Sequence, residues 1–532
     1  MIFNKYITRS AFKSALLACA FAIGGCSTPI IQPTQPSDQI VENHPAANTH
    51  APTITVEDIV VSKPELPDDL WHRIRQGFQL SVIENTRVNA QLRWYASHQA
   101  YMDRVADRAT PYFHYIVEAV EEREIPLEIA LLPIVESAFD PFAYSHGRAA
   151  GLWQFVPGTG RRFKLKQNWW YDGRRDVAEA TRAALDYLEY LHSQFDDWLL
   201  ALAAYNSGEG NVFKAIRRNR AQGKPVDFWN LRLPRETRAY VPKLLALQRI
   251  VSNPDTYNIT LKTVADEPRL ARVRLTGQID LALVAELADV PVSDVYLLNP
   301  GFNRWATDPD GPHELFLPLE KKDLFEARLT EIPADQHVRW RRHKIGSGET
   351  LSEIAARYNT TVSMLRQING ISGNVIRSGK HLLVPVAAQN MSAYNLSESQ
   401  RLARKRSIPR GDQKVIHTVR PGDSFWEIAR RYGTTVRQVA SWNGMAPRDP
   451  LRVGEELVIW TDKPNMPAAA IPANTVRTIT YTVRRGDSLS RISAKFGVSV
   501  SDLLRWNGIS SKKYLQPGQK LKLYVDVTKQ ST

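Results

Sequence analysis

A repeated pattern in the C-terminal half constrains the fold of this 532-residue chain more than any other feature. Each of three copies begins with a glycine, an acidic residue and a hydroxyl residue, and reaches an Asn-Gly pair 21 residues after that glycine. The starting glycines are Gly348, Gly422 and Gly486, and the matching asparagines are Asn369, Asn443 and Asn507. A fixed offset of this kind is typical of a repeated structural unit.

Each copy predicts a small unit of mixed secondary structure. A strand-like pattern such as 481–483 leads in, two helical patterns follow, and a second strand such as 382–385 closes the copy. The two strands can pair while both helices cover one face of the resulting sheet. We therefore expect βααβ modules of the α+β class at 342–387, 414–461 and 478–525.

The segments around the copies complete this predicted organisation. Polar stretches at about 387–413 and 462–476 separate the copies, so we expect independent modules that share no core. A weaker pattern of the same kind at 256–335 lacks the Gly-Asp-Ser start. We expect a degenerate module there, with a packing role.

The repeat resembles the LysM module, a family whose members bind the N-acetylglucosamine part of peptidoglycan and chitin. The resemblance implies a groove between the first strand–helix loop and the second helix–strand loop, with glycan-binding residues at the start of each copy. These residues are Gly348, Thr350, Gly422, Asp423, Ser424, Gly486, Asp487 and Ser488. A single Gly-Asp-Ser triplet would fit a helix N-cap without any ligand, but three matching copies favour binding. Trp442 and Trp506 could stack on sugar rings, although core packing is favoured for both.

The N-terminus is typical of an export signal. Lys5, Arg9 and Lys13 precede an apolar run of 11 residues at 15–25, which is too short to span a bilayer. The run ends in Ile-Gly-Gly-Cys at Cys26, which resembles the bacterial lipobox and implies a lipoprotein signal over 1–26 with lipidation of Cys26. Cleavage as an ordinary signal peptide is the alternative.

The residues after the signal extend this expectation. Ser27 implies, by the same resemblance, sorting to the periplasmic face of the outer membrane, where the lipid would anchor the protein. Residues 27–65 are rich in Pro, Gln, Thr, Asn and Ala and are expected to form a flexible tether.

Composition restricts the remaining chemistry. Cys19 and Cys26 are the only cysteines, so the domains beyond them have no disulfide, thiolate metal site or cysteine nucleophile. The twelve histidines show no metal-binding spacing, and we expect neither a metal nor a cofactor. The net charge of +14 favours an anionic partner. Peptidoglycan, with its peptide carboxylates, meets that need, whereas the export signal and the lack of a nucleic-acid motif argue against nucleic acid.

The region 66–255 is predicted to form one mostly α-helical domain. Leu185, Leu188 and Leu191 recur at the spacing of one helix face. The nearly all-apolar run at 198–205 indicates a buried helix, which Gly208 is expected to end.

Glu136 is the candidate catalytic residue of that domain. It lies among apolar neighbours that include Val135 and Phe139, and burial of a carboxyl raises its pKa. A carboxylic acid with a raised pKa can donate a proton near neutral pH. The alternative is a glutamate at a helix end that points to solvent. We interpret the Asp-Pro pair at Asp140 as a turn.

Four motifs favour the catalytic interpretation. In chain order they are Glu136-Ser137, Gly151-Leu152-Trp153-Gln154, Ala204-Tyr205-Asn206 and the late Tyr240. Together they resemble the lysozyme-like lytic transglycosylases of the soluble-transglycosylase type over about 105–250, with Trp153 in place of the usual Met. The expected fold is therefore multidomain: a mostly α lysozyme-like catalytic domain followed by small α+β (βααβ) LysM modules.

The resemblance implies a role for each matched residue. Glu136 would protonate the oxygen of the β-1,4 bond between N-acetylmuramic acid and N-acetylglucosamine. It would then accept the proton of the muramyl C6 hydroxyl, which closes on C1 to give a 1,6-anhydromuramyl end. The substrate-binding residues would be Ser137, Ser145, Gln154, Tyr205, Asn206 and Tyr240. A structural capping role is nearly as favoured for Ser137 and Asn206.

Two other functions fit the sequence less well. A lysozyme-type hydrolase would use the same fold to add water. A non-catalytic cell-wall-binding lipoprotein would rely on the LysM modules alone, but the joint presence of Glu136, Gln154 and Tyr205 argues against it. The sequence thus predicts a peptidoglycan lytic transglycosylase, a carbon–oxygen lyase of the bacterial cell envelope.

Overall fold

The computed structural model describes residues 69–81, 84–461, 476–484, 486–496, 498, 500–509 and 515–526. The predictions for the export signal with Cys26, for the tether at 27–65 and for most of the polar stretch at 462–476 lie outside the described residues. In the described part of the chain, no helix is both long enough and apolar enough to cross a membrane.

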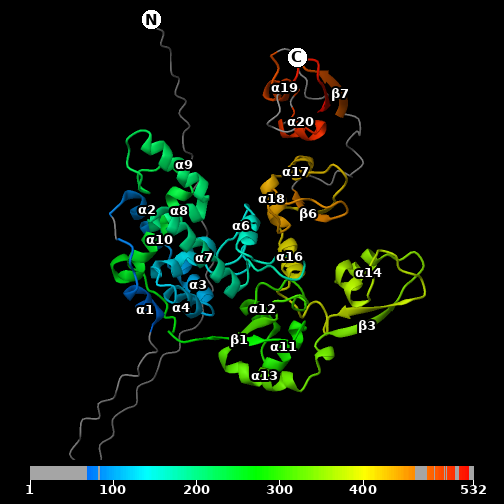
Figure 1. Ribbon diagram of the computed structural model, residues 1–532, viewed down its shortest axis with the longest axis horizontal. Helices are drawn as coiled ribbons and strands as arrows, with labels where there is room; N and C mark the ends of the chain where they lie inside the picture. Colours follow the sequence, from blue (N-terminus) through cyan, green and yellow to red (C-terminus); the bar gives the residue numbers. More distant parts are fainter. Residues whose placement is uncertain are drawn as a thin grey trace, which may run out of the picture. The chain divides into compact units, whose positions relative to one another are not determined.

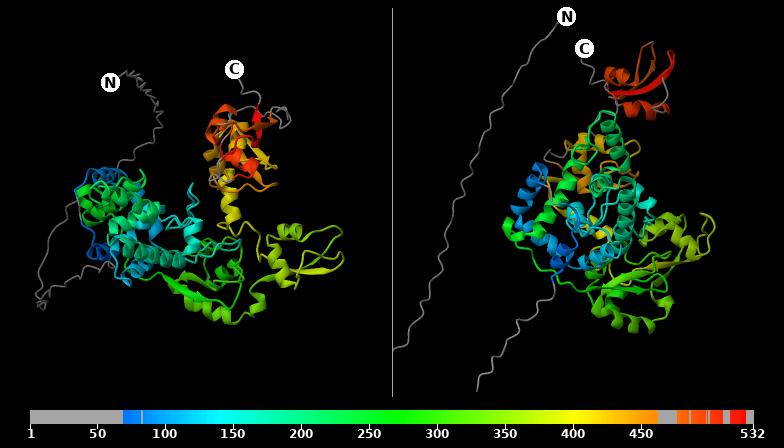
Figure 2. Two further views of the ribbon diagram at one scale, coloured as in Figure 1. Left: turned by 45° about the horizontal axis from the view of Figure 1, so that its top comes forward. Right: turned by 60° about the vertical axis from the view of Figure 1, so that its left-hand side comes forward.

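The helices between residues 70 and 257 pack around one apolar core (Figure 1). They are α1 (Leu70–Gln76), α2 (Thr86–Ala96), α3 (Gln99–Ala109), α4 (Phe113–Glu121), η1 (Leu127–Leu131), α5 (Leu132–Ser137), α6 (Pro157–Arg162), α7 (Val177–Phe195), α8 (Trp198–Ser207), α9 (Glu209–Arg220), α10 (Thr237–Ser252) and η2 (Pro254–Tyr257). Both views of Figure 2 show these helices, coloured blue to green, gathered together. The almost wholly apolar α8 buries 200–204 against α7, α9 and α10 and ends before Gly208. The predicted α-helical domain with a buried helix at its centre is confirmed.

Residues 270–336 form a unit built on one antiparallel strand pair. β1 (Leu270–Arg274) pairs with β2 (Glu314–Pro318), and α11 (Leu281–Ala288) and α12 (Val292–Leu298) lie between them in the chain. The unit continues with η3 (Leu319–Lys321), α13 (Lys322–Thr330) and η4 (Ala334–Gln336). The weaker repeat pattern therefore has the same strand–helix–helix–strand order as the three clear copies.

Three further units repeat that order, and each has its own apolar cluster. The first comprises β3 (Arg339–Lys344), α14 (Leu351–Arg357), α15 (Val362–Ile368) and β4 (His381–Val386). The second comprises β5 (Gln413–Thr418), α17 (Phe425–Tyr432), α18 (Val436–Trp442) and β6 (Glu456–Thr461), and the third β7 (Val476–Thr482), α19 (Leu489–Phe496), α20 (Val500–Asn507) and β8 (Lys520–Asp526). In each unit the two strands pair antiparallel, so the predicted βααβ modules are confirmed. Trp442 is only 5% exposed and packs in the core of its module, as favoured.

The fixed 21-residue offset has a structural cause. Asn443, just beyond α18, donates its side-chain amide to the carbonyl oxygens of Val439 and Val458 at 2.9 and 2.7 Å. Its side-chain oxygen accepts from the N–H of Val458 at 2.7 Å. The equivalent three bonds are made by Asn369, Asn507 and, in the weaker unit, Asn299. The asparagine thus joins the second helix to the second strand, and its place in the sequence cannot shift without breaking that joint.

The polar stretch at 387–413 separates the first two LysM modules, as predicted, but it has structure of its own. The segment contains α16 (Glu398–Ser407), and before it Tyr394 is fully buried with its hydroxyl donating to the Asp280 carboxylate at 2.9 Å. The three LysM modules have separate apolar clusters, as predicted, but one side chain of the first module packs with the LysM-like unit instead. Met364 of α15 belongs to the same buried cluster as side chains of β1, β2 and α11. Neither contact had a signal in the sequence, because a single buried side chain, Tyr394 or Met364, is enough to make it.

Candidate active site

The turn that follows α5 sets the position of Glu136. Pro133 suits the first turn of this short helix, and Ala138 and Phe139 beyond its end both have positive φ, 50° and 54°. Residues with a side chain rarely adopt this backbone conformation. Phe139 is fully buried and packs edge-on against Phe113, with ring centroids 5.4 Å apart. That packing holds the unfavourable turn and thereby fixes the helix end that carries Glu136.

The carboxyl of Glu136 has the electrostatic character that the sequence predicted. Burial raises its pKa to about 7, although the side chain keeps some contact with solvent. The hydroxyl of Tyr240 donates to Oε1 of Glu136 at 2.6 Å and partly opposes that rise, because it stabilises the charged form. Glu236 raises this pKa slightly and Lys243 lowers it slightly. Near neutral pH the group can therefore be found with or without its proton.

Hydrogen bonds tie the 148–155 loop to the helices around Glu136. Ser137 donates its hydroxyl to the carbonyl oxygens of Pro133 and Leu152, at 3.1 and 3.0 Å. Tyr205 on α8 donates its hydroxyl to the carbonyl oxygen of Trp153 at 2.9 Å. The fully buried Trp153 indole donates to Oγ1 of Thr181 on α7, also at 2.9 Å. The loop is thus held from three helices, α5, α7 and α8.

Gln154 stands at the tip of that loop in a constrained conformation. Its φ is 49°, and its side-chain amide donates to the carbonyl oxygen of Gly151 at 2.8 Å. Gly151 has a φ of 80°, and a Cβ at this position would lie 2.0 Å from the carbonyl oxygen of Arg174. Only glycine fits there, which explains the glycine of the Gly-Leu-Trp-Gln motif.

The remaining predicted residues of the catalytic domain lie in different surroundings. Asn206 accepts a hydrogen bond from the Thr237 hydroxyl at 2.8 Å, which joins the end of α8 to the start of α10. Ser145 accepts from the backbone N–H groups of Gly147 and Ala149, at 3.2 and 3.0 Å, and so closes its own turn. Asp140 accepts from the backbone N–H of Phe142 at 2.9 Å, so the interpretation of Asp-Pro as a turn is confirmed.

A buried ion pair that the sequence analysis missed supports the loop from behind. Arg174 makes two parallel contacts to Asp172, at 2.9 and 2.8 Å, and both residues are buried. The same guanidinium donates to the backbone oxygens of Arg148 and Phe155, at 2.7 and 3.3 Å, one at each end of the loop. The only sequence signal was the run of charges at 172–176, which resembles any solvated surface.

In the LysM modules the predicted binding residues also build the loop that holds them. Oδ2 of Asp423 lies 2.8 Å from the backbone N of Arg420, which donates to it, and 2.9 Å from Nε2 of His417. Burial alone would raise the pKa of Asp423, but these contacts outweigh it and the pKa is lowered. Ser424 caps α17 by accepting from the N–H of Glu427 at 3.2 Å. Thr350 and Ser488 cap the matching helices, and Gly348, Gly422 and Gly486 all have positive φ.

Among the described residues, no cluster of three or more His, Cys, Asp or Glu side chains is arranged to hold a metal ion.

Comparison with known proteins connects this geometry to a family. Residues 114–228, which include Glu136, Gln154, Tyr205 and Asn206, match the Transglycosylase SLT domain. Residues 343–385, 417–460 and 481–523 match the LysM domain, and 269–334 match the family described as "Lytic transglycosylase MltD, LysM-like domain". Membrane-bound lytic murein transglycosylase D of Escherichia coli (strain K12) is 37% identical over 466 residues, which cover 86% of this chain and 99% of the relative. The chain belongs to this family of lytic murein transglycosylases.

Two further similarities cover only parts of this chain. An autolysin of Enterococcus faecalis is 34% identical over 184 residues, covering 34% of this chain and 24% of the relative. The crystal structure of the 70 kDa soluble lytic transglycosylase SLT70 of Escherichia coli covers 35% of this chain and 33% of its own, with 22% sequence identity and a TM-score of 0.23. The chain is thus a lytic transglycosylase of the cell envelope that carries LysM glycan-binding modules.

Proposed function

We propose that Glu136 alone supplies the acid and the base with which this lytic transglycosylase cleaves peptidoglycan. The protonated carboxyl gives its proton to the oxygen of the β-1,4 bond between N-acetylmuramic acid and N-acetylglucosamine, and the bond from C1 to that oxygen breaks. The resulting carboxylate takes the proton of the muramyl C6 hydroxyl, and the C6 oxygen bonds to C1. No water enters, and the product ends in a 1,6-anhydromuramyl ring.

The observation that carries this proposal is the pKa of Glu136 near 7 together with its 2.6 Å hydrogen bond from Tyr240. An acid and a base in one group require a pKa close to the working pH, because each protonation state has to be accessible in turn. Tyr240 favours the charged state, so it assists the first half of the reaction, in which Glu136 gives up its proton and becomes a carboxylate.

The other predicted residues are proposed to bind and position the substrate. Gln154 presents its amide from the constrained tip of the 148–155 loop. Tyr205 holds that loop through the Trp153 carbonyl, and Ser137 holds it to α5. Asn206 and Ser145 would lie beside the bound glycan and act through the contacts that join α8 to α10 and close the 145–149 turn.

The placement of the protein in the envelope is also a proposal. Cys26 would carry the lipid that anchors the chain to the periplasmic face of the outer membrane, after loss of the signal at 1–26. The tether at 27–65 would then connect this anchor to a catalytic domain at 66–255. The LysM-like module at 256–335 and LysM modules at 342–387, 414–461 and 478–525 would follow. The eight predicted residues at the starts of the LysM modules would contact glycan.

The test is digestion of purified murein sacculi followed by mass spectrometry of the soluble products. The wild type is expected to release products with 1,6-anhydromuramyl ends, and Glu136→Gln is expected to release none above background. Glu236→Gln is the matched control, since Glu236 is exposed and only slightly raises the pKa of Glu136. Products with reducing muramyl ends would show a hydrolase instead, and release by Glu136→Gln at the wild-type rate would exclude Glu136 as the acid.

A further inference from the structure

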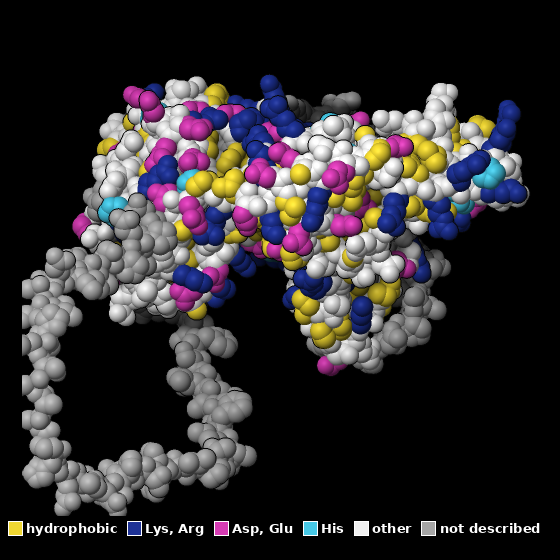
Figure 3. All heavy atoms as spheres, turned by 90° about the horizontal axis from the view of Figure 1, so that it is seen from below, with side chains coloured by type: hydrophobic (Ala, Val, Ile, Leu, Met, Phe, Trp, Pro, Cys, Tyr) yellow, Lys and Arg dark blue, Asp and Glu magenta, His cyan; other side chains and the backbone are white. Residues whose placement is uncertain are grey.

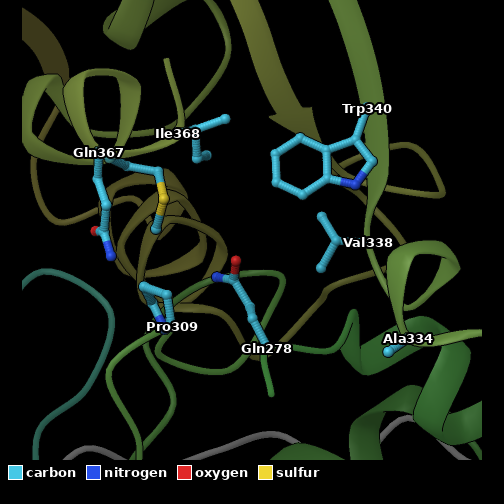
Figure 4. Close-up of a pocket in the computed structure, with 8 residues that line it drawn as sticks. Gln278, Pro309, Ala334, Val338, Trp340, Gln367 and Ile368 are labelled. Atoms are coloured by element: carbon cyan, nitrogen blue, oxygen red, sulfur yellow. The ribbon is translucent and has the colours of Figure 1, made fainter. Parts of the chain in front are cut away.

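A cavity lies at the seam between the LysM-like unit and the first LysM module. We call it the seam cavity, and it has a volume of about 230 Å³. Its walls come from both units, so neither unit alone would form it (Figure 4). The lining residues are Gln278, Pro309, Ala334, Val338, Trp340, Met364, Gln367 and Ile368.

The two units that form the seam are packed together through buried side chains. Val338 and Met364, each 4% exposed, belong to one apolar cluster with the LysM-like unit. The fully buried Trp305 of that unit donates its indole N–H to the carbonyl oxygen of Asn359 in the first LysM module, at 3.3 Å. The cavity walls are therefore held in a fixed arrangement, as a preformed binding site requires.

Trp340 forms one wall of the seam cavity and is unusually exposed for a large aromatic residue. It is 40% exposed, while its indole N–H donates to the carbonyl oxygen of Asp335 at 3.2 Å. That bond restrains the ring, and Figure 4 shows the indole beside the cavity, with Ile368 on another side. A second cavity of about 630 Å³ is also lined by Val338 and Trp340. A long ligand could thus lie along the indole and occupy both cavities.

Amide side chains supply the polar groups of the seam cavity. Gln278 donates its amide to the carbonyl oxygen of Thr307 at 2.8 Å, which leaves its own side-chain oxygen as an acceptor. The side chain of Gln367 lines the cavity and is exposed, so its amide can both donate and accept. An acetamido group has one N–H and one carbonyl oxygen, and two such amides complement it.

The strand that carries Trp340 is strongly basic. Arg339, Arg341, Arg342 and Lys344 of β3 are all exposed. Figure 3 shows Lys and Arg side chains gathered at the right-hand end of the visible face, over the module that contains β3 and α14 in Figure 1. Peptidoglycan bears carboxylates on its stem peptides next to apolar sugar faces. A basic strand with one central aromatic residue suits such a polymer better than it suits a cationic ligand.

We propose that the seam cavity is a further glycan-binding site, separate from the residues around Glu136 and from the loops at the start of each LysM module. One N-acetylhexosamine ring stacks on Trp340, and its acetamido group lies between Gln278 and Gln367. The inference rests on the proposed function only in taking peptidoglycan as the polymer. It gives the LysM-like unit a role in binding in addition to packing.

The test follows the Trp340 resonance in the full chain. The protein is labelled with 5-fluorotryptophan on a Glu136→Gln background, which prevents cleavage, and the spectrum of Trp340→Phe assigns the signal. Titration with the tetramer of N-acetylglucosamine is expected to shift that signal in a saturable way. The double variant Gln278→Ala/Gln367→Ala is expected to weaken the apparent affinity at Trp340 at least five-fold. Leu383→Ala is the matched control, since Leu383 is 39% exposed on β4 of the same sheet and lies outside the cavity lining.

Two results would overturn the inference. One is a Trp340 signal that stays fixed while other tryptophan signals saturate, and the second is a shift caused by free stem peptide and not by the sugar. The anhydromuramyl assay on the wild type separates this failure from failure of the proposed function. Anhydromuramyl products together with a fixed Trp340 signal would reject the seam site alone.

Discussion

The surroundings of Glu136 contain one influence that disfavours its charged form and another that favours it. Burial favours the neutral acid, while the Tyr240 hydroxyl favours the carboxylate. The balance leaves the pKa at about 7, where transfer of a proton in either direction costs little free energy. Activity of the wild type is therefore expected to fall as the pH rises above about 7, because the acid loses its proton before substrate arrives.

Removal of the Tyr240 hydroxyl should move that pH dependence. Tyr240→Phe deletes the donor to the carboxylate, so the pKa of Glu136 rises further. A hydrogen bond to a charged group contributes about 1.5–3 kcal/mol, and about 1.4 kcal/mol corresponds to one pKa unit. We expect the alkaline fall in activity to move up by about one pH unit, with a lower maximal rate. The measurement is the rate of anhydromuramyl product release between pH 5 and 9, and an unmoved alkaline limb would contradict the role given to Tyr240.

The same burial should reduce stability at high pH. The pKa of Glu136 is raised in the folded protein, so the folded state binds the proton more tightly than the unfolded state does. The carboxylate therefore destabilises the fold above about pH 7, and this cost disappears below the unfolded pKa of about 4.5. Glu136→Gln is expected to raise the melting temperature of the catalytic domain at pH 8 and to leave it unchanged at pH 4. Equal melting temperatures at pH 8, measured by circular dichroism, would show that the carboxyl is not desolvated.

At the scale of single elements, the 148–155 loop depends on a close backbone approach. Gly151 lies against the carbonyl oxygen of Arg174, and Arg174 in turn binds both ends of the loop. The short α5 and the loop meet through the Ser137 hydroxyl. Glu136 and Gln154 are thus positioned by connected contacts to the backbone of this loop, in addition to the geometry of α5.

Substitution of Gly151 tests that dependence. In Gly151→Ala the new methyl group would meet backbone at 2.0 Å with φ at 80°, so the loop has to move. We expect at least a ten-fold loss of product release together with a lower melting temperature. Gly158→Ala in the first turn of α6 is the matched control, because its methyl group would meet nothing within 4 Å and alanine favours a helix. Similar activity in the two variants would contradict the claim that loop position limits catalysis.

The LysM-like unit packs against segments that precede it and follow it in the chain. Trp170 and Tyr171 of the catalytic domain and Met364 of the first LysM module belong to its buried cluster. Tyr394, which follows that LysM module, reaches back to Asp280 at the N-terminus of α11. Burial raises the pKa of Asp280, and hydrogen bonds from the Ala388 N–H and the Tyr394 hydroxyl oppose that rise.

Two shortened chains should therefore differ in stability. A chain that ends at 386 loses both of these donors to Asp280, whereas a chain that ends at 410 keeps them and also keeps α16. A buried carboxylate that loses such bonds costs about 1–3 kcal/mol for each partner. We expect the shorter chain to unfold at a lower temperature, by several degrees, when both are measured by circular dichroism. Identical melting temperatures would show that the segment at 387–397 does not stabilise the LysM-like unit.

Features that depend on residues close together in the sequence could be predicted from the sequence. The repeat offset predicted that the three copies share one structure, because Asn443 and its counterparts have to reach a strand at a fixed distance. The apolar neighbours of Glu136 predicted its raised pKa. Contacts between distant segments had no such signal, since Arg174, Tyr394 and Met364 resemble ordinary surface or core residues in sequence. The left-handed turn at Ala138 was equally hidden, because the packing of Phe139 imposes it from outside the helix.

Isotope labelling of the products distinguishes attack on C1 by the C6 hydroxyl from attack by water. Sacculi are digested in ¹⁸O-labelled water, and the new muramyl ends are weighed by mass spectrometry. If Glu136 directs the C6 hydroxyl onto C1, every new end is an unlabelled 1,6-anhydromuramyl group, and Glu136→Gln forms none. New reducing ends that carry ¹⁸O would show that water attacks C1, and the account of Glu136 as the acid and base of a transglycosylase would be wrong.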